Sequence, residues 1–159
     1  MPDAARPVAI LAAEAPPRVR STGYPADLAA RVAGRDKRPL GDMFGLGVFG
    51  VNLTRLAPGA WSALHHRHGK QDEFIYVVEG APVLVTDAGE TQLAPGMCAG
   101  FAAGGSPHHV ENRTAADVLI LEVGDRGAGD SVLYPDDDLA AAMGPDGKWR
   151  YTRKNGTPV

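Results

Sequence analysis

Apolar residues occur in short runs from Phe44 onward, and each run has the length of a β-strand. The runs cover residues 49–56, 74–78, 82–86 and 118–123, and a further one starts at Val110. Turn-forming stretches such as Ala94-Pro95-Gly96 separate them, at spacings that suit hairpins without intervening helices. The pattern predicts an all-β protein, an antiparallel sandwich or barrel over residues 41–134.

The two ends of the chain have a different pattern. Residues 1–40 contain six prolines, which exclude long helices, so we expect an extended arm that lies on the barrel or on a partner subunit. Residues 135–159 begin with a proline and three aspartates, followed by Leu139 and three alanines. An acidic first turn before such residues predicts one short helix, followed by a final strand or arm.

Composition narrows the possible partners. The chain has 159 residues, enough for one domain. Its 20 glycines and 13 prolines fit a protein rich in turns. Basic residues are scattered and the formal net charge is −3, so nucleic acid is not an expected partner. No apolar run approaches the roughly 20 residues of a membrane span. Cys98 is the only cysteine and the first residues match a secretory signal poorly, so we expect a cytoplasmic protein.

The five histidines fall into two clusters, at residues 65–68 and 108–109. In a strand, His66 and His68 share one face, and Glu73 starts the next apolar run on the face of Ile75. A carboxylate on that face needs a counter-charge, and a metal would supply it. Imidazole and carboxylate donors suit Mn, Fe, Co, Ni, Cu or Zn rather than calcium or magnesium. His65 and His109 are alternative ligands at this point.

Two glycine-framed motifs resemble those of the cupins, a family of small β-barrels. The first runs from Gly59 through His66-Arg67-His68 and Glu73 to Gly80, and one interval is a residue longer than in the family pattern. The second runs from Gly96 through Ala102-Ala103-Gly104 and His108 to Asn112, with Ala102 in place of the usual proline. The resemblance implies a double-stranded β-helix, or jelly roll. It also implies a metal held by four ligands: His66, His68, Glu73 and His108.

The resemblance says less about the reaction, because cupins carry many unrelated activities. We expect a small metal-dependent enzyme, an oxygenase, lyase or isomerase, acting on a carboxylate, enolate or polyol in the barrel mouth. The alternatives are a non-catalytic binding protein with a metal-anchored ligand and a metal-free sugar isomerase or epimerase.

Strand alternation also predicts what surrounds the ligands. It places four apolar residues beside them, which favours a small, partly apolar ligand over a free sugar: Leu64, Ile75, Val77 and Val110. His65 and His109 should lie on the outer face or the rim. The proline-rich arm and the outward-facing aromatic residues Phe74 and Tyr76 predict a homodimer.

Overall fold

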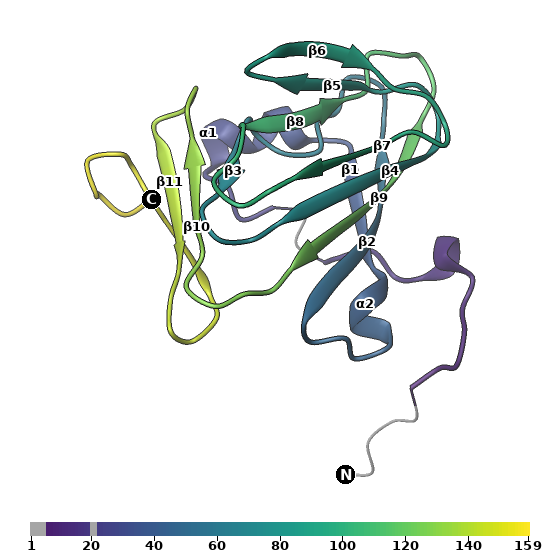
Figure 1. The fold of residues 1–159 in the computed structure, drawn as a ribbon, viewed down its shortest axis with the longest axis horizontal. Coiled ribbons are helices and arrows are strands. Elements are labelled where there is room, and N and C mark those ends of the chain that lie inside the picture. The colour runs from purple at the N-terminus through teal and green to yellow at the C-terminus, as the bar shows by residue number, and fades with distance from the viewer. Residues whose placement is uncertain (1–5, 20–21) are drawn as a thin grey trace.

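The computed structural model describes residues 6–19 and 22–159. Over these residues the chain forms three antiparallel sheets that curve around one another (Figure 1). The helices and 3-10 turns are short and lie at the N-terminal end: η1 Ala12–Glu14, α1 Ala26–Ala29, η2 Ala30–Val32 and α2 Leu40–Met43. None of the described helices is long and apolar enough to cross a membrane. The all-β architecture predicted from the sequence is confirmed.

The largest sheet has five strands in the order β1-β2-β9-β4-β7. Their bounds are β1 Arg35–Pro39, β2 Phe49–Leu56, β9 Val118–Asp125, β4 Glu73–Glu79 and β7 Cys98–Phe101. The central strands alternate as the sequence predicts: Ile75 and Val77 face inward and are buried, whereas Phe74 and Tyr76 are each 41% exposed. One face of this sheet therefore closes the core, and the other faces solvent.

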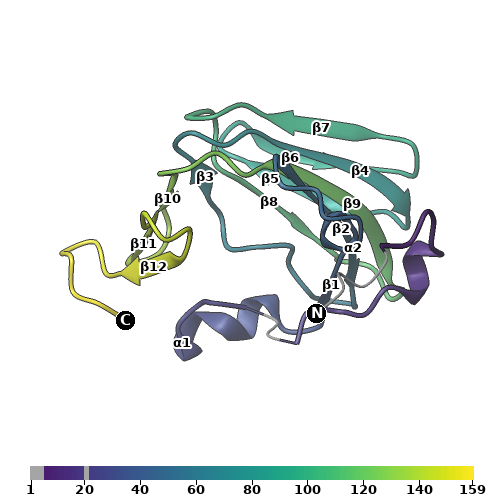
Figure 2. The same cartoon turned by 90° about the horizontal axis from the view of Figure 1, so that it is seen from below.

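The other two sheets complete the curved wall. The three-stranded sheet has the order β6-β5-β8, with β5 Val83–Thr86, β6 Gly89–Gln92 and β8 His108–Glu111. The four-stranded sheet has the order β12-β11-β10-β3, with β3 Arg67–His68, β10 Ser131–Tyr134, β11 Leu139–Met143 and β12 Trp149–Thr152. In Figure 2 this last sheet stands to one side of the other strands, with α1 below the space between them.

The main hydrophobic core lies between the five-stranded and three-stranded sheets. It includes Val77, Val118 and Ile120 from the first and Leu84 and Val110 from the second, all buried. A tight turn after β4 begins at Gly80, where φ is +84° and a Cβ atom would approach Val118 Cγ2 to 2.7 Å. Glycine fits this position because it has no Cβ and adopts positive φ without strain.

The prediction of a short helix after Asp136 is wrong, because Leu139–Met143 forms β11, which pairs with β10 in a hairpin. Leu139 and Ala141 alternate inward along β11, and both are buried. They pack with Leu28, Leu64 and Val132 in a second core cluster. Alanine has the highest helix propensity, but this intrinsic preference is small, and the packing of alternate residues overrides it.

The N-terminal segment is only partly an extended arm. Residues 35–39 form β1, which pairs with β2 over its whole length, from Arg35 opposite Leu56 to Pro39 opposite Asn52. Before it, Leu28 of α1 packs into the second core cluster. Arg31 pairs with Asp137 across the two ends of the chain. The N-terminal segment and the C-terminal hairpin are thus joined on one side of the barrel.

Candidate metal centre

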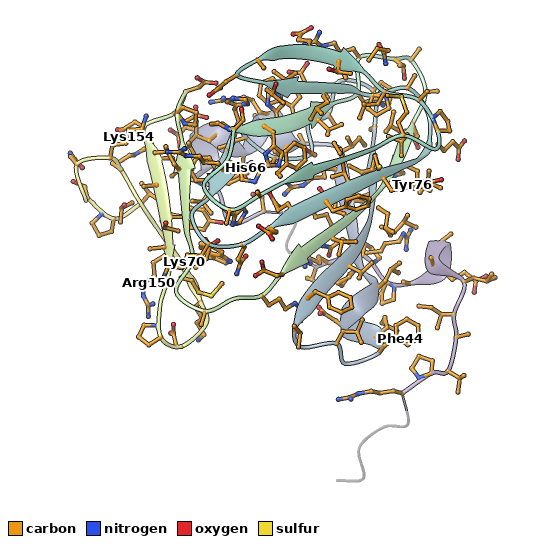
Figure 3. All side chains as sticks on the ribbon, in the orientation of Figure 1. Phe44, His66, Lys70, Tyr76, Arg150 and Lys154 are labelled. Atoms are coloured by element: carbon orange, nitrogen blue, oxygen red, sulfur yellow. The ribbon has the colours of Figure 1, made fainter. Side chains whose placement is uncertain are left out.

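Three neighbouring elements bring the histidines and the glutamate together. His66 precedes β3 and forms an antiparallel bridge with His108 at the start of β8, with N–H···O distances of 2.8 and 3.2 Å between their backbones. His68 ends β3, and Glu73 begins β4. The four residues proposed from the motifs therefore lie at one end of the barrel, and Figure 3 shows His66 among the strands, well away from Tyr76.

The three imidazoles converge on the Glu73 carboxylate. The Nε2 atoms of His66 and His108 lie 3.4 and 3.2 Å from Oε2, and that of His68 lies 3.6 Å from Oε1. Ligand atoms of His66, His68 and Glu73 all lie within 4.8 Å of one another, the spread of donors around a single ion. His108 joins this group through its contact with Glu73 and its ring, centred 5.0 Å from that of His66.

Hydrogen bonds on the far side of each ring determine which nitrogen is free. His66 Nδ1 donates to Leu64 O at 2.8 Å, and His108 Nδ1 faces Ser106 O at 3.4 Å. His68 Nδ1 donates to Asp130, whose side chain is completely buried. A neutral imidazole with its proton on Nδ1 presents a lone pair on Nε2. All three Nε2 lone pairs therefore point toward the carboxylate.

The converging nitrogen lone pairs and the Glu73 carboxylate form a site suited to a cation. Glu73 Oε2 is buried and has no hydrogen-bond donor in the part of the chain that the structure describes. Three lone pairs and an unsatisfied carboxylate oxygen repel one another unless a positive charge lies between them, supplied either by protons on the Nε2 atoms or by a metal ion. Three imidazoles and one carboxylate suit a divalent transition metal.

The electrostatics favour an ionised Glu73 carboxylate and a neutral His108 ring. Burial raises the pKa of the Glu73 carboxyl, but hydrogen bonds that the imidazoles of His108 and His66 donate when Nε2 carries a proton, and the positive charge that His66 and His68 carry when protonated, outweigh it and hold this pKa well below its ordinary value. Burial also lowers the pKa of His108 and so favours the neutral ring. The carboxylate is thus ionised and His108 uncharged near neutral pH.

His65 and His109 lie in a separate cluster on the other side of their strands. Their Nδ1 atoms are 3.0 Å apart, while His65 Nε2 donates to Asp87 at 3.0 Å and His109 Nε2 to Glu111 at 2.8 Å. They thus lie on the face away from the candidate ligands, as predicted, but they are only 6% and 4% exposed. Trp61 stacks on the His109 ring with centroids 4.3 Å apart, which covers the pair.

A cavity of about 390 Å³ opens from the four converging side chains. Ile75 and Val110 line it as predicted, but Leu64 and Val77 are absent from its wall among the described residues. Much of the rest of the wall is polar, and it includes Arg18, Lys37, Asn52, Glu122, Tyr24 and Tyr134. The wall is therefore more polar than alternation predicts, which favours a polar ligand over a partly apolar one.

A signal for part of this polar wall is present in the sequence. Glu122 interrupts an apolar strand and shares the face of Val118 and Ile120, where alternation alone places a carboxylate beside the core. Tyr24 and Tyr134 carry no such signal, because each belongs to a different end of the chain. Only the packing of α1 against the β10–β11 hairpin brings their rings to 5.7 Å.

Known protein families and solved structures that resemble this chain have the same fold. Residues 52–124 match the Cupin domain family. A structure from Silicibacter pomeroyi DSS-3, described as a sugar phosphate isomerase from a cupin superfamily, is 44% identical, with a TM-score of 0.86 over 92% of this chain and 93% of that one. The chain therefore belongs to the cupin superfamily.

Two further structures show how far the similarity reaches. A protein from Acidithiobacillus ferrooxidans ATCC 23270, assigned provisionally as a sugar phosphate isomerase, is 26% identical, with a TM-score of 0.71 over 86% of this chain and 94% of that one. A polyketide cyclase from Streptomyces resistomycificus, 20% identical with a TM-score of 0.61 over 74% and 78% of the two chains, shares the fold alone. No curated protein matches the chain.

Proposed function

We propose that the protein is a metal-dependent isomerase that moves a carbonyl group between adjacent carbons of a small sugar phosphate. The observation that carries this proposal is the convergence of His66, His68, Glu73 and His108 at the end of a polar cavity of about 390 Å³. The volume lies within the range of small-molecule sites. The sugar phosphate class is supported by the description of the 44% identical structure.

The four ligands would hold one divalent transition metal, drawn from Mn, Fe, Co, Ni, Cu or Zn. When bound, such an ion supplies a Lewis acid that polarises a carbonyl oxygen. Asp130 positions His68 by accepting a hydrogen bond from its Nδ1, as carboxylates commonly do for metal-bound histidines. The Glu73 carboxylate supplies the negative charge of the site.

Isomerisation also needs a group that moves a proton, and Glu122 is placed to do so. It lies on β9, beside β4, with Asn52 and Ile75 as its partners across the sheet, and its carboxylate lines the same cavity. Glu122 accepts hydrogen bonds from Lys37 Nζ at 2.8 Å and from Thr54 Oγ1, which hold it in place. As a base it would take a proton from the hydroxyl-bearing carbon and return it to the neighbouring, former carbonyl carbon. The proton of that hydroxyl would pass to the former carbonyl oxygen, so that one C=O bond is lost and one is formed. The exchange therefore balances without an oxidant or reductant.

The proposal is tested by metal content and by activity on the same preparations. Protein purified without a histidine tag should contain one transition metal per chain, and it should convert members of a panel of three- to six-carbon aldose phosphates to ketose phosphates, followed by ¹H NMR in D₂O. His66→Ala and His68→Ala should lose metal by orders of magnitude, together with activity.

The matched control is His65→Ala, which removes a neighbouring imidazole that faces Asp87 instead. Its metal content should barely change. Equal metal content in all three variants would refute the ligand set. A metal-loaded protein that converts none of the panel would refute isomerisation and favour the non-catalytic binding protein.

A further inference from the structure

The cavity has a positively charged end, remote from the four candidate metal ligands. Lys37 lies on β1, opposite Thr54 of β2, and its side chain reaches into the cavity as far as Glu122. Arg18 lies beside it, because its backbone N–H donates to Lys37 O at 2.8 Å. Its guanidinium donates to Asn52 Oδ1 at 3.0 Å. Two cations and an amide from three separate segments thus share one corner of the cavity.

Charge at this corner is not fully compensated. Lys37 and Glu122 form an ion pair whose side chains are 20% and 17% exposed. Arg18 forms no ion pair with any residue that the structure describes, so its charge remains. The charges of Lys37 and Glu122 offset each other, so Arg18 supplies the net positive charge of this corner.

Both cations retain hydrogen-bond donors for a ligand. A lysine ammonium has three N–H donors and an arginine guanidinium has five. One contact to Glu122 and one to Asn52 leave several of them directed elsewhere. A guanidinium beside an ammonium is well suited to a phosphate group, which accepts several charge-assisted hydrogen bonds at once.

The distance between this corner and the metal ligands matches a short carbon chain. Glu73 lies opposite Gly124 of the neighbouring strand β9. Glu122 is two residues before Gly124 on that strand. Strand spacing and rise place the Cα atoms of Glu73 and Glu122 about 8 Å apart. Lys37 Nζ lies just beyond the Glu122 carboxylate, at 2.8 Å. A molecule of a few carbons can therefore touch both ends of the cavity.

We propose that Arg18 and Lys37, together with Asn52, form a phosphate subsite that orients the substrate with its phosphate toward β1 and its carbonyl toward the metal ligands. The inference rests on the proposed function, since it names where that substrate's phosphate binds. Glu122 then lies between the two ends, next to the carbons where the proton moves. Arg18 and Lys37 precede residues 52–124, so the segment before the matched Cupin domain supplies the selectivity for phosphate.

The test measures phosphate binding directly. Inorganic phosphate is titrated into the purified protein and followed by ³¹P NMR, with Arg18→Gln and Lys37→Met as variants. Loss of one charge-assisted contact should weaken phosphate binding about 10-fold or more. Arg113→Gln and Lys154→Met remove the same charges outside the cavity and should bind phosphate as the unaltered protein does. Circular dichroism checks folding, and Arg18→Gln remains informative if Lys37→Met unfolds.

Two further measurements distinguish this subsite from phosphate bound at the metal ligands and from a site for any anion. The double variant His66→Ala/His68→Ala should retain phosphate binding, because the subsite does not use the metal. Loss of binding in that variant, with Arg18→Gln unaffected, would place the anion at the metal and overturn the subsite. Acetate that competes as strongly as phosphate would overturn the assignment to phosphate. Phosphate bound through Arg18 and Lys37 in a protein that isomerises nothing would sustain the subsite and refute the proposed function.

Discussion

Asp130 is the buried residue whose replacement should most sharply test the candidate metal centre. Its side chain is completely buried. One oxygen accepts a hydrogen bond from His68 Nδ1, and the other accepts a hydrogen bond from the backbone N–H of Lys70 at 2.7 Å. The substitution Asp130→Asn keeps the size and shape of the side chain. It also changes one of the two acceptors into a donor.

The geometry predicts which contact is reversed. The backbone N–H of Lys70 can only donate, so the amide oxygen should turn toward it and the NH₂ group toward His68. His68 Nδ1 must then accept, and its proton moves to Nε2, the atom that faces Glu73. A protonated Nε2 cannot bind a metal.

The expected loss in metal affinity is about 10- to 100-fold, the usual cost of removing a carboxylate behind a ligating histidine. That corresponds to about 1.4–2.7 kcal/mol. Affinity is measured by competition with a chromophoric chelator, using zinc and cobalt. The control Asp117→Asn alters an exposed carboxylate paired with Arg55 and should leave affinity unchanged. Equal affinity in the two variants would show that Asp130 does not position His68 for a metal.

Three other predictions concern stability, catalysis and assembly. Leu139→Ala should lower the free energy of unfolding by about 2–5 kcal/mol in urea titrations, because Leu139 is fully buried under the N-terminal segment; a change below about 1 kcal/mol would contradict that packing. Glu122→Gln should reduce the isomerisation rate about 10²- to 10⁴-fold with metal content unchanged, and an unaltered rate would exclude Glu122 as the base. Light scattering should give the mass of a dimer for the unaltered protein. The double variant Phe74→Glu/Tyr76→Glu places charge on the exposed face of β4 and should have the mass of a monomer. A monomer mass for the unaltered protein would refute the dimer.

The agreement between sequence and structure is greatest within the cupin motifs. His66 and His68 are two residues apart, so any extended conformation places them on one face. Gly80 is needed where the turn after β4 touches Val118. Such features depend on a few neighbouring residues and on a repeat of two, and for that reason they can be predicted without knowing the tertiary structure.

The errors occur where distant segments meet. The local pattern predicts a helix for the alanines after Asp138, yet Leu139 and Ala141 form a strand because an apolar surface including Leu28 and Leu64 covers one of its faces. Alternation places His65 and His109 on the outer face or the rim, but it does not predict that they are buried there, with Trp61 stacked on His109. In each case the deciding contact is with residues far away in sequence, which no local pattern contains.

The linear order of residues is thus sufficient for the all-β class, for the four candidate metal ligands and for the separation of inward from outward positions. It is insufficient for the character of the cavity. Lys37, Glu122 and Asn52 lie on three different strands, and Arg18 lies before all of them. Strand pairing alone brings these charges within reach of one another. Periodicity states which face a side chain is on, whereas pairing and packing decide which other side chains share that face.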